Sequence, residues 1–219
     1  MTATAAGQAG TRRRAMTVPA AVGAAFTASW IAGLAIPVPS PPMAAPGAAI
    51  VTALAGHGGA LAANYVFTEG LPAFGLAAVS AFLARALRGR GATGLARTAQ
   101  VAGLIAAAIS LTQCVLGLAL TRASAPGTAQ ELFQLVNRLD GAKMFALAVL
   151  AGAAAAAALL PGWLRYLSAA LAISITASGV AYLLLADSLA WLAWPAGLLL
   201  LAVIPAVGYV LGRARMELR

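Results

Sequence analysis

Residues 142–160 read AKMFALAVLAGAAAAAALL, a run in which Lys143 carries the single charge. An α-helix needs about 20 predominantly apolar residues to cross the ~30 Å hydrocarbon core of a bilayer, and this run is close to that length. Five other stretches of the chain have the same character. The sequence therefore predicts a six-helix transmembrane bundle, with spans near 17–37, 65–85, 98–120, 142–160, 166–186 and 190–211.

The composition of the whole chain also indicates a membrane protein. Of its 219 residues, 62% are hydrophobic and 9% are charged, with a mean hydropathy of +0.92. Soluble domains carry roughly 25% charged residues, so this composition cannot build a water-soluble surface. We expect one all-α transmembrane domain over 16–212, a disordered basic tail over 1–15 and a short tail over 213–219. The loops are too short to hold a soluble catalytic or receptor domain.

Basic residues are distributed unevenly between the two ends of the predicted bundle. The chain has 14 Lys and Arg against 5 Asp and Glu, a formal net charge of +9. Arg122, Arg138 and Lys143 fall on one side of the six spans, together with four of the acids. By the positive-inside rule, this asymmetry predicts that both termini lie in the cytoplasm. We expect the protein to lie in a bacterial inner (cytoplasmic) membrane. The arginines on the cytoplasmic side are Arg12, Arg13, Arg14, Arg85, Arg88, Arg90, Arg97, Arg165, Arg213, Arg215 and Arg219.

We interpret these arginines as topology signals that also attract anionic lipid at the cytoplasmic face. Nucleic acid is not an expected partner, because no basic surface is interleaved with aromatic residues. A cleaved signal peptide at the first span is disfavoured, since its apolar run of about 20 residues exceeds the usual 7–15.

Two segments on the outer side precede the second span. Residues 38–47, VPSPPMAAPG, contain four prolines and predict an extended linker. Residues 47–64 are apolar enough to touch the membrane, but glycines interrupt them. A full span here would make seven crossings and export the arginine-rich C-terminus, so we expect an outer-surface or a re-entrant helix.

A third outer segment precedes the fourth span. Residues 128–131, TAQE, match the capping box, in which Thr and Glu satisfy each other's unpaired backbone donors. We therefore expect a helix to begin at Thr128. Its apolar face predicts that it lies along the membrane interface and bends near Gly141 into the fourth span.

Polar side chains gather toward the outer side of the predicted bundle. Counting about 1.5 Å of rise per residue from the cytoplasmic ends puts groups from four spans in the outer third of the bilayer. We expect Glu69 to pair with Lys143 or Arg138, because an unpaired carboxylate is costly there. This network either locks spans two, three and four together or lines a pocket open to the outside. The candidate pocket residues are Glu69, Gln113, Asn137, Arg138, Asp140, Lys143, Ser178 and Tyr182.

Motifs for known chemistry are not legible in the sequence. It has no phosphate-binding glycine loop, nucleophile elbow or metal-ligand spacing. Cys114 and His57 are the single cysteine and histidine, which excludes a disulfide and a bis-histidine haem within one chain. We expect no cofactor, no metal site and no catalytic residue.

Four short motifs spread over nearly the whole chain support a family resemblance: the arginines at 12–14, TEG at 68–70, TQC at 112–114 and VNRLDGAKM at 136–144. With these motifs the chain resembles the small six-span integral membrane proteins of high-GC actinobacteria, a family of uncharacterised function. The resemblance implies a source and a fold. It implies no activity and no functional residue.

Three function classes fit these observations. The sequence favours a non-catalytic partner or assembly subunit of an envelope system, because it lacks catalytic motifs and is rich in small packing residues. The alternative is a small transporter or ligand-binding membrane protein with an outward-facing polar pocket. An intramembrane enzyme is less favoured, since Glu69, Asp140 and Lys143 are the residues able to act as acid or base. A second copy of the chain or another membrane protein is the expected protein partner.

Overall fold

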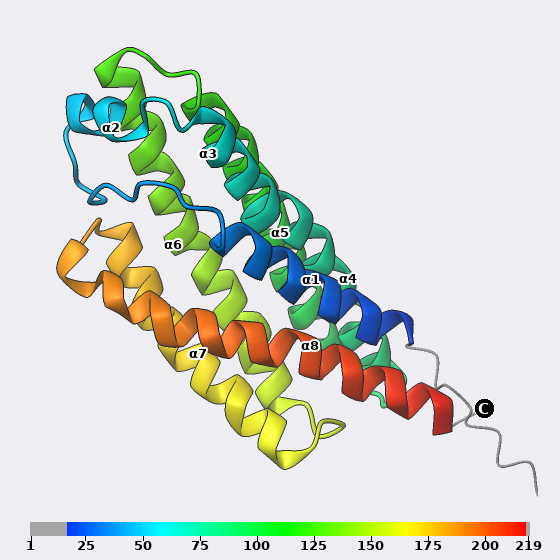
Figure 1. Ribbon diagram of the computed structural model, residues 1–219. Helices are drawn as coiled ribbons and strands as arrows, with labels where there is room; N and C mark the ends of the chain where they lie inside the picture. Colours follow the sequence, from blue (N-terminus) through cyan, green and yellow to red (C-terminus); the bar gives the residue numbers. More distant parts are fainter. Residues whose placement is uncertain (1–16, 218–219) are drawn as a thin grey trace, which may run out of the picture.

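The computed structural model describes residues 17–217, and these form a helical bundle without strands (Figure 1). A π-helical turn, Val66–Gly70, joins α3 to α4, and a 3-10 turn, Asp187–Leu192, precedes α8. The predicted all-α class is confirmed. The expected tail over 1–15 lies outside the described residues. The helices are α1 (Val18–Leu34), α2 (Gly47–Leu54), α3 (Gly58–Tyr65), α4 (Leu71–Arg88), α5 (Thr93–Leu120), α6 (Pro126–Ala156), α7 (Gly162–Leu183) and α8 (Ala193–Glu217).

A helix stands at each of the six predicted span positions. Among the described residues, five helical segments are long and apolar enough to cross a membrane: Gly58–Arg88, Thr93–Leu120, Pro126–Ala156, Gly162–Leu183 and Asp187–Arg213. Helix α1 is apolar but has 17 residues, or about 26 Å of rise, slightly less than the hydrocarbon core. Six crossings therefore stay a prediction.

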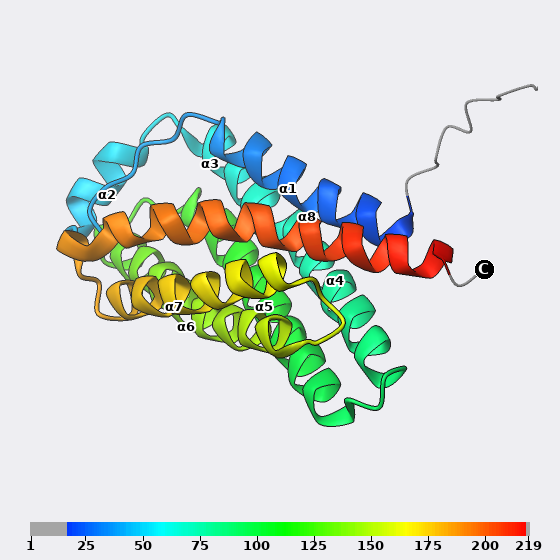
Figure 2. The same ribbon diagram turned by 90° about the horizontal axis from the view of Figure 1, so that it is seen from below.

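The order of the helices follows from their short connections. Turns at 89–92 and 157–161 make α4 with α5, and α6 with α7, antiparallel neighbours. Helix α8 packs on α7 and on α1, and the two views show α1 and α8 side by side (Figures 1 and 2). The start of α1 and the end of α8 consequently lie at the same end of the bundle. The loops between α4 and α5 and between α6 and α7 lie at this end too, so we call it the arginine-rich end.

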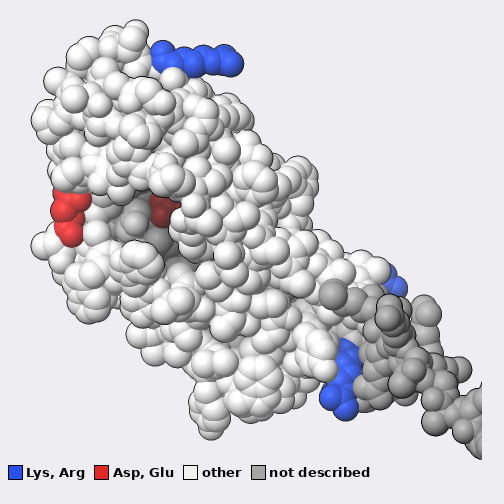
Figure 3. Space-filling model, viewed as in Figure 1, with Lys and Arg blue, Asp and Glu red and all other residues white. Residues whose placement is uncertain are grey.

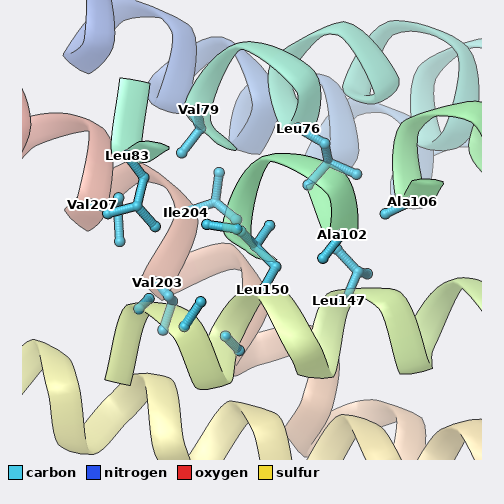
Figure 4. Packing of buried hydrophobic residues seen from close by; sticks show 14 of the residues in the cluster. Leu76, Val79, Leu83, Ala102, Ala106, Leu147, Leu150, Val203, Ile204 and Val207 are labelled. Atoms are coloured by element: carbon cyan, nitrogen blue, oxygen red, sulfur yellow. The ribbon is translucent and has the colours of Figure 1, made fainter. Parts of the chain in front are cut away.

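The interior toward the arginine-rich end is almost entirely apolar. Leucine, valine and isoleucine from α4, α6 and α8 meet alanines of α5 there, and the small alanines let the helices approach closely. This cluster supplies the apolar floor beneath the polar site. Figure 4 labels Leu76, Val79, Leu83, Ala102, Ala106, Leu147, Leu150, Val203, Ile204 and Val207 of it.

A second, smaller apolar cluster covers the opposite end of the bundle, which we call the outer end after the topology predicted from the sequence. It joins α2 and α3 to the end of α5 and the start of α6 through Ile50, Leu61, Leu120 and Ala129. The segment 47–64 is therefore not one helix. Helix α2 packs on α6, whereas α3 belongs to the helical segment Gly58–Arg88, which is long and apolar enough to cross a membrane and begins before the predicted start near residue 65.

Helix α6 corrects the expectation of a separate interfacial helix before the fourth span. It runs without interruption from Pro126 to Ala156, about 46 Å. Ala125 is its N-cap residue and gives no side-chain cap, so the capping box at Thr128 is not used. The apolar face of the first turns packs under α2 and α3, which removes the reason for that face to lie on the membrane surface.

Gly141 serves close helix packing in this continuous helix. A Cβ added to Gly141 would stand 2.7 Å from the Gly179 carbonyl oxygen and 2.8 Å from the Leu183 amide nitrogen of α7. Glycine at this position therefore allows α6 and α7 to touch backbone to backbone, next to Asp140.

Candidate functional site

Lys143 lies at the centre of a buried charged cluster near the outer end of the bundle. Its ammonium nitrogen Nζ is 2.8 and 2.7 Å from the two carboxylate oxygens of Glu69, on the π-helical turn. The same nitrogen is 2.6 Å from Oδ1 of Asp140, one turn earlier on α6. Lys143 is 4% exposed and Glu69 8%. The predicted pairing of Glu69 with Lys143 is confirmed.

Two polar residues of α5 extend this cluster to a third helix. The side-chain amide of Gln113 donates to Asp140 Oδ1 at 3.3 Å and to the Val136 carbonyl oxygen at 3.1 Å. The Ser110 hydroxyl hydrogen-bonds the Glu69 carboxylate. Gln113 is 1% exposed, and its amide oxygen Oε1 is buried without a hydrogen-bond partner. The network therefore joins the π-helical turn, α5 and α6, and it keeps one hydrogen-bond acceptor without a donor.

The cluster carries unequal numbers of opposite charges. Two carboxylates, Glu69 and Asp140, face one ammonium, Lys143, which leaves a formal net charge of −1 when all three are ionised. Arg138 is exposed and forms no ion pair with either acid, so it does not balance the charge. A net charge in a low-dielectric interior is costly. The site consequently favours the arrival of a positive group.

Pro72 explains why the helix widens beside Glu69. Proline has no N–H and its ring collides with the carbonyl four residues earlier, here that of Thr68. The Leu71 N–H correspondingly bonds to the Val66 carbonyl, five residues back, which is the π-helical pattern. This extra residue in the turn changes the direction of the side chains that follow. Turns of this type occur frequently at functional sites.

Helix α1 satisfies the two carbonyl groups that Pro72 leaves without a partner. The Thr68 carbonyl accepts the indole N–H of Trp30 at 2.7 Å, and the Phe67 carbonyl accepts the Ser29 hydroxyl at 2.8 Å. The Thr68 carbonyl bond is partly buried and the Phe67 carbonyl bond is exposed, so the bond from Trp30 contributes more to the stability of the widened turn. Helix α1 thereby holds the segment that carries Glu69.

The remaining predicted site residues divide into two groups. Ser178 is fully buried on α7 with a hydroxyl that has no partner, and Tyr182, one turn further, lies within electrostatic reach of Asp140 and Lys143. Tyr182 therefore lies on the α7 side of the cluster. Asn137 donates its amide to the Phe133 carbonyl of its own helix at 2.8 Å, and its place in the pocket stays a prediction.

Arg138 is exposed and forms no ion pair with Glu69 or Asp140, so its place in the pocket also stays a prediction. Sequence reasoning in turn missed Ser110, which bonds Glu69, and Tyr65, whose ring covers Gly117 and lies within electrostatic reach of Glu69. Helical spacing could have identified both. Ser110 precedes Gln113 by three residues, and Tyr65 precedes Glu69 by four.

The cluster reaches the surface through Asp140, whose side chain is 21% exposed. Figure 3 shows a hollow on this face, between the linker that follows α1 and the turn before α8, with acidic atoms at its floor. The linker is fastened beside it, because Asp187 accepts the Met43 N–H at 2.7 Å and the Ala44 N–H at 3.4 Å. The linker forms no helix, as its prolines predict, but it contains a turn in which the Ala45 N–H bonds to the Pro42 carbonyl at 2.9 Å.

Transition-metal ligands are not assembled in this region. Within residues 17–217, no three His, Cys, Asp or Glu side chains gather closely enough to hold a metal ion. Comparisons with models of protein families, with curated proteins and with solved structures find no match to this chain.

Proposed function

We propose that this protein is a small transporter or ligand-binding membrane protein whose outer pocket accepts a monovalent cation or the ammonium group of a small solute. The observation that carries the proposal is the excess of one carboxylate in the buried Glu69–Lys143–Asp140 cluster. An ionisable group inside a membrane bundle marks a functional site by default, because burying it is costly.

The unfilled hydrogen-bonding capacity of the cluster supports a cationic ligand. Oε1 of Gln113 has no donor, and Asp140 has one oxygen beyond the one that contacts Lys143 and Gln113. Both are acceptors, so a ligand that joins them must donate protons or carry positive charge. The π-helical turn that carries Glu69 also supports the proposal, because interrupted helices line the binding sites of many membrane transporters.

The direct test is cation binding to the purified protein in detergent. We expect the melting temperature to rise with sodium, potassium, ammonium or ethylammonium chloride at constant ionic strength, held with N-methylglucamine chloride. Asp140→Asn should weaken the response at least about ten-fold, because it removes the surplus charge and that is worth more than ~1.4 kcal/mol in a desolvated site.

Two further variants make the test specific. Glu131→Gln removes an exposed acid from the same helix and should leave cation binding unchanged. Gln113→Met removes the unpartnered amide oxygen without changing charge, and should weaken binding even if Asp140→Asn fails to fold. The proposal is overturned if none of the four cations changes the wild-type melting curve, or if Asp140→Asn responds like the wild type.

A non-catalytic partner or assembly subunit is the second candidate. It is favoured by large side chains exposed along α7, among them Tyr166 at 79% and Ile173 at 75%, which a partner helix would cover. Cross-linking from position 173 in native membranes to one discrete protein would support it, whereas cross-links to lipid alone would not.

We also propose a bacterial inner membrane as the location, with the arginine-rich end in the cytoplasm. The support is the placement of the connecting loops rich in arginine at one end of the bundle. The resemblance to six-span actinobacterial membrane proteins agrees with this location.

A further inference from the structure

A groove runs between α5 and α6 on the outside of the bundle, and its Arg97 end lies far from the charged cluster. Its volume is about 380 Å³. Its walls are apolar and face outward, with Val101, Ile105 and Val149 each close to half exposed. Both helices are long and apolar enough to cross a membrane, so the groove opens toward lipid.

The groove ends in a positive charge. Arg97 lines it at the arginine-rich end, beside Thr98 and Gly94. No heavy atom lies within 4 Å of the position that a Cβ on Gly94 would take, so the backbone leaves space next to the guanidinium. Arg97 is exposed and none of the salt bridges of the described residues involves it. The groove is therefore amphipathic, with about 12 Å of apolar wall between Arg97 and Ile105.

We propose that this groove is a binding site for one anionic phospholipid. An acyl chain lies along Val101, Ile105 and Val149, and the phosphate pairs with Arg97. The N–H donors of a guanidinium can pair with two oxygens of one phosphate. A basic residue at the membrane surface also attracts the headgroup of an anionic lipid. A second helix would fill the apolar walls but would leave the arginine without a counter-charge, which is why lipid is the favoured occupant.

This site is independent of the proposed cation pocket. Arg97 and Gln113 are 16 residues apart on α5, or about 24 Å along the axis, and they lie toward opposite ends of the bundle. Loss of lipid binding would leave the cation proposal untouched, and the reverse also holds.

Native mass spectrometry tests the proposal on the full chain released from detergent. The protein is incubated with equal amounts of phosphatidylglycerol and phosphatidylcholine that carry the same acyl chains. We expect one retained phosphatidylglycerol, favoured over phosphatidylcholine, and Arg97→Gln should lower that preference about five-fold, the effect of one basic residue at a lipid headgroup.

Three comparisons separate this site from general attraction to the basic end. Arg90→Gln removes the same charge from an exposed loop and should keep the wild-type preference. Ala146→Phe fills the groove and should reduce retention of both lipids, whereas inorganic phosphate alone should not displace the bound lipid. The proposal is overturned if Arg97→Gln keeps the preference, if Arg90→Gln lowers it equally, if phosphate displaces the lipid, or if both lipids are retained equally by the wild type.

Discussion

Replacing Lys143 by methionine is the most demanding perturbation of the charged cluster. Methionine keeps most of the volume and the flexibility of the lysine stem but removes the ammonium group. In the native site that group lies 2.6–2.8 Å from oxygens of both Glu69 and Asp140. The variant therefore leaves two carboxylates facing each other, and the formal charge of the cluster changes from −1 to −2.

The expected cost follows from burial. Removing one partner of a buried ion pair destabilises a protein by about 3–5 kcal/mol, because the remaining charge is left uncompensated. The side chains of Lys143 and Glu69 are 6% and 11% exposed, so bulk water relieves little of this cost. We expect Lys143→Met to lower the free energy of unfolding by an amount in that range.

Charge counting predicts an asymmetry between the two members of the pair. Glu69→Gln removes a negative charge, so Lys143 and Asp140 remain as a neutral pair. We expect this variant to cost about 1 kcal/mol, the loss of a single hydrogen-bonding contribution. In Glu69→Gln/Lys143→Met the cluster returns to −1, carried by the partly exposed Asp140. The double variant should therefore be more stable than Lys143→Met alone, although it contains an additional substitution.

The assay is equilibrium unfolding of each variant in mixed micelles with increasing SDS mole fraction, followed by circular dichroism. Added salt should have little effect on the differences, since buried pairs are screened weakly. A cost below about 1 kcal/mol for Lys143→Met, or a double variant at least as unstable as Lys143→Met, would refute the reasoning. Either result would mean that water reaches the site or that the ion pair of Lys143 with Glu69 does not contribute to the free energy of unfolding.

Two further predictions concern the packing that positions the cluster. Trp30→Phe should cost about 1–2 kcal/mol by leaving a carbonyl of the π-helical turn without a donor, and adding Pro72→Ala should recover part of this cost, because alanine supplies the missing N–H. Purely additive effects in the same unfolding assay would contradict this account. Gly141→Ala should cost about 1–3 kcal/mol by forcing α6 away from α7, whereas Gly152→Ala on the same helix, with open space around it, should be neutral or slightly stabilising. Equal effects of the two glycine substitutions would show that close packing at 141 is not required.

The charged cluster could be predicted from the sequence because membrane depth is a simple function of position. Counting rise along each span placed Glu69, Gln113 and Lys143 at similar heights, and few other polar groups were available as partners. The cost of burying them alone made their contact the favoured arrangement. Height contains no information about rotation around the helix axis. Asn137 and Arg138 were therefore both predicted at the site, although Arg138 is exposed and the Asn137 amide donates to its own helix.

The outer end of the bundle could not be predicted in the same way. The start of α6 has the composition of an interfacial helix, and an isolated helix of this kind would lie on the membrane surface. In the fold, Leu132 and Phe133 pack beneath α2 and α3. That contact joins segments about 70–80 residues apart in the chain, and no local pattern encodes it. Because of this tertiary packing, α6 starts at Pro126 without the capping box and continues through Gly141 without a break.

The sequence left two interpretations of the polar network equally open, a lock between helices and a pocket. An ion-pair network that only joins helices is least costly with equal numbers of acids and bases. The pair of Glu69 with Lys143 alone would meet this condition. Asp140 is a second acid in the cluster, and it is partly exposed. It accepts an N–H of the Gln113 side-chain amide, and the oxygen of that amide has no hydrogen-bond donor. A surplus carboxylate beside an unfilled acceptor adds cost to a lock but gives a pocket its affinity for cations. This imbalance is the physical reason for favouring the pocket, and the cation response of Asp140→Asn measures it directly.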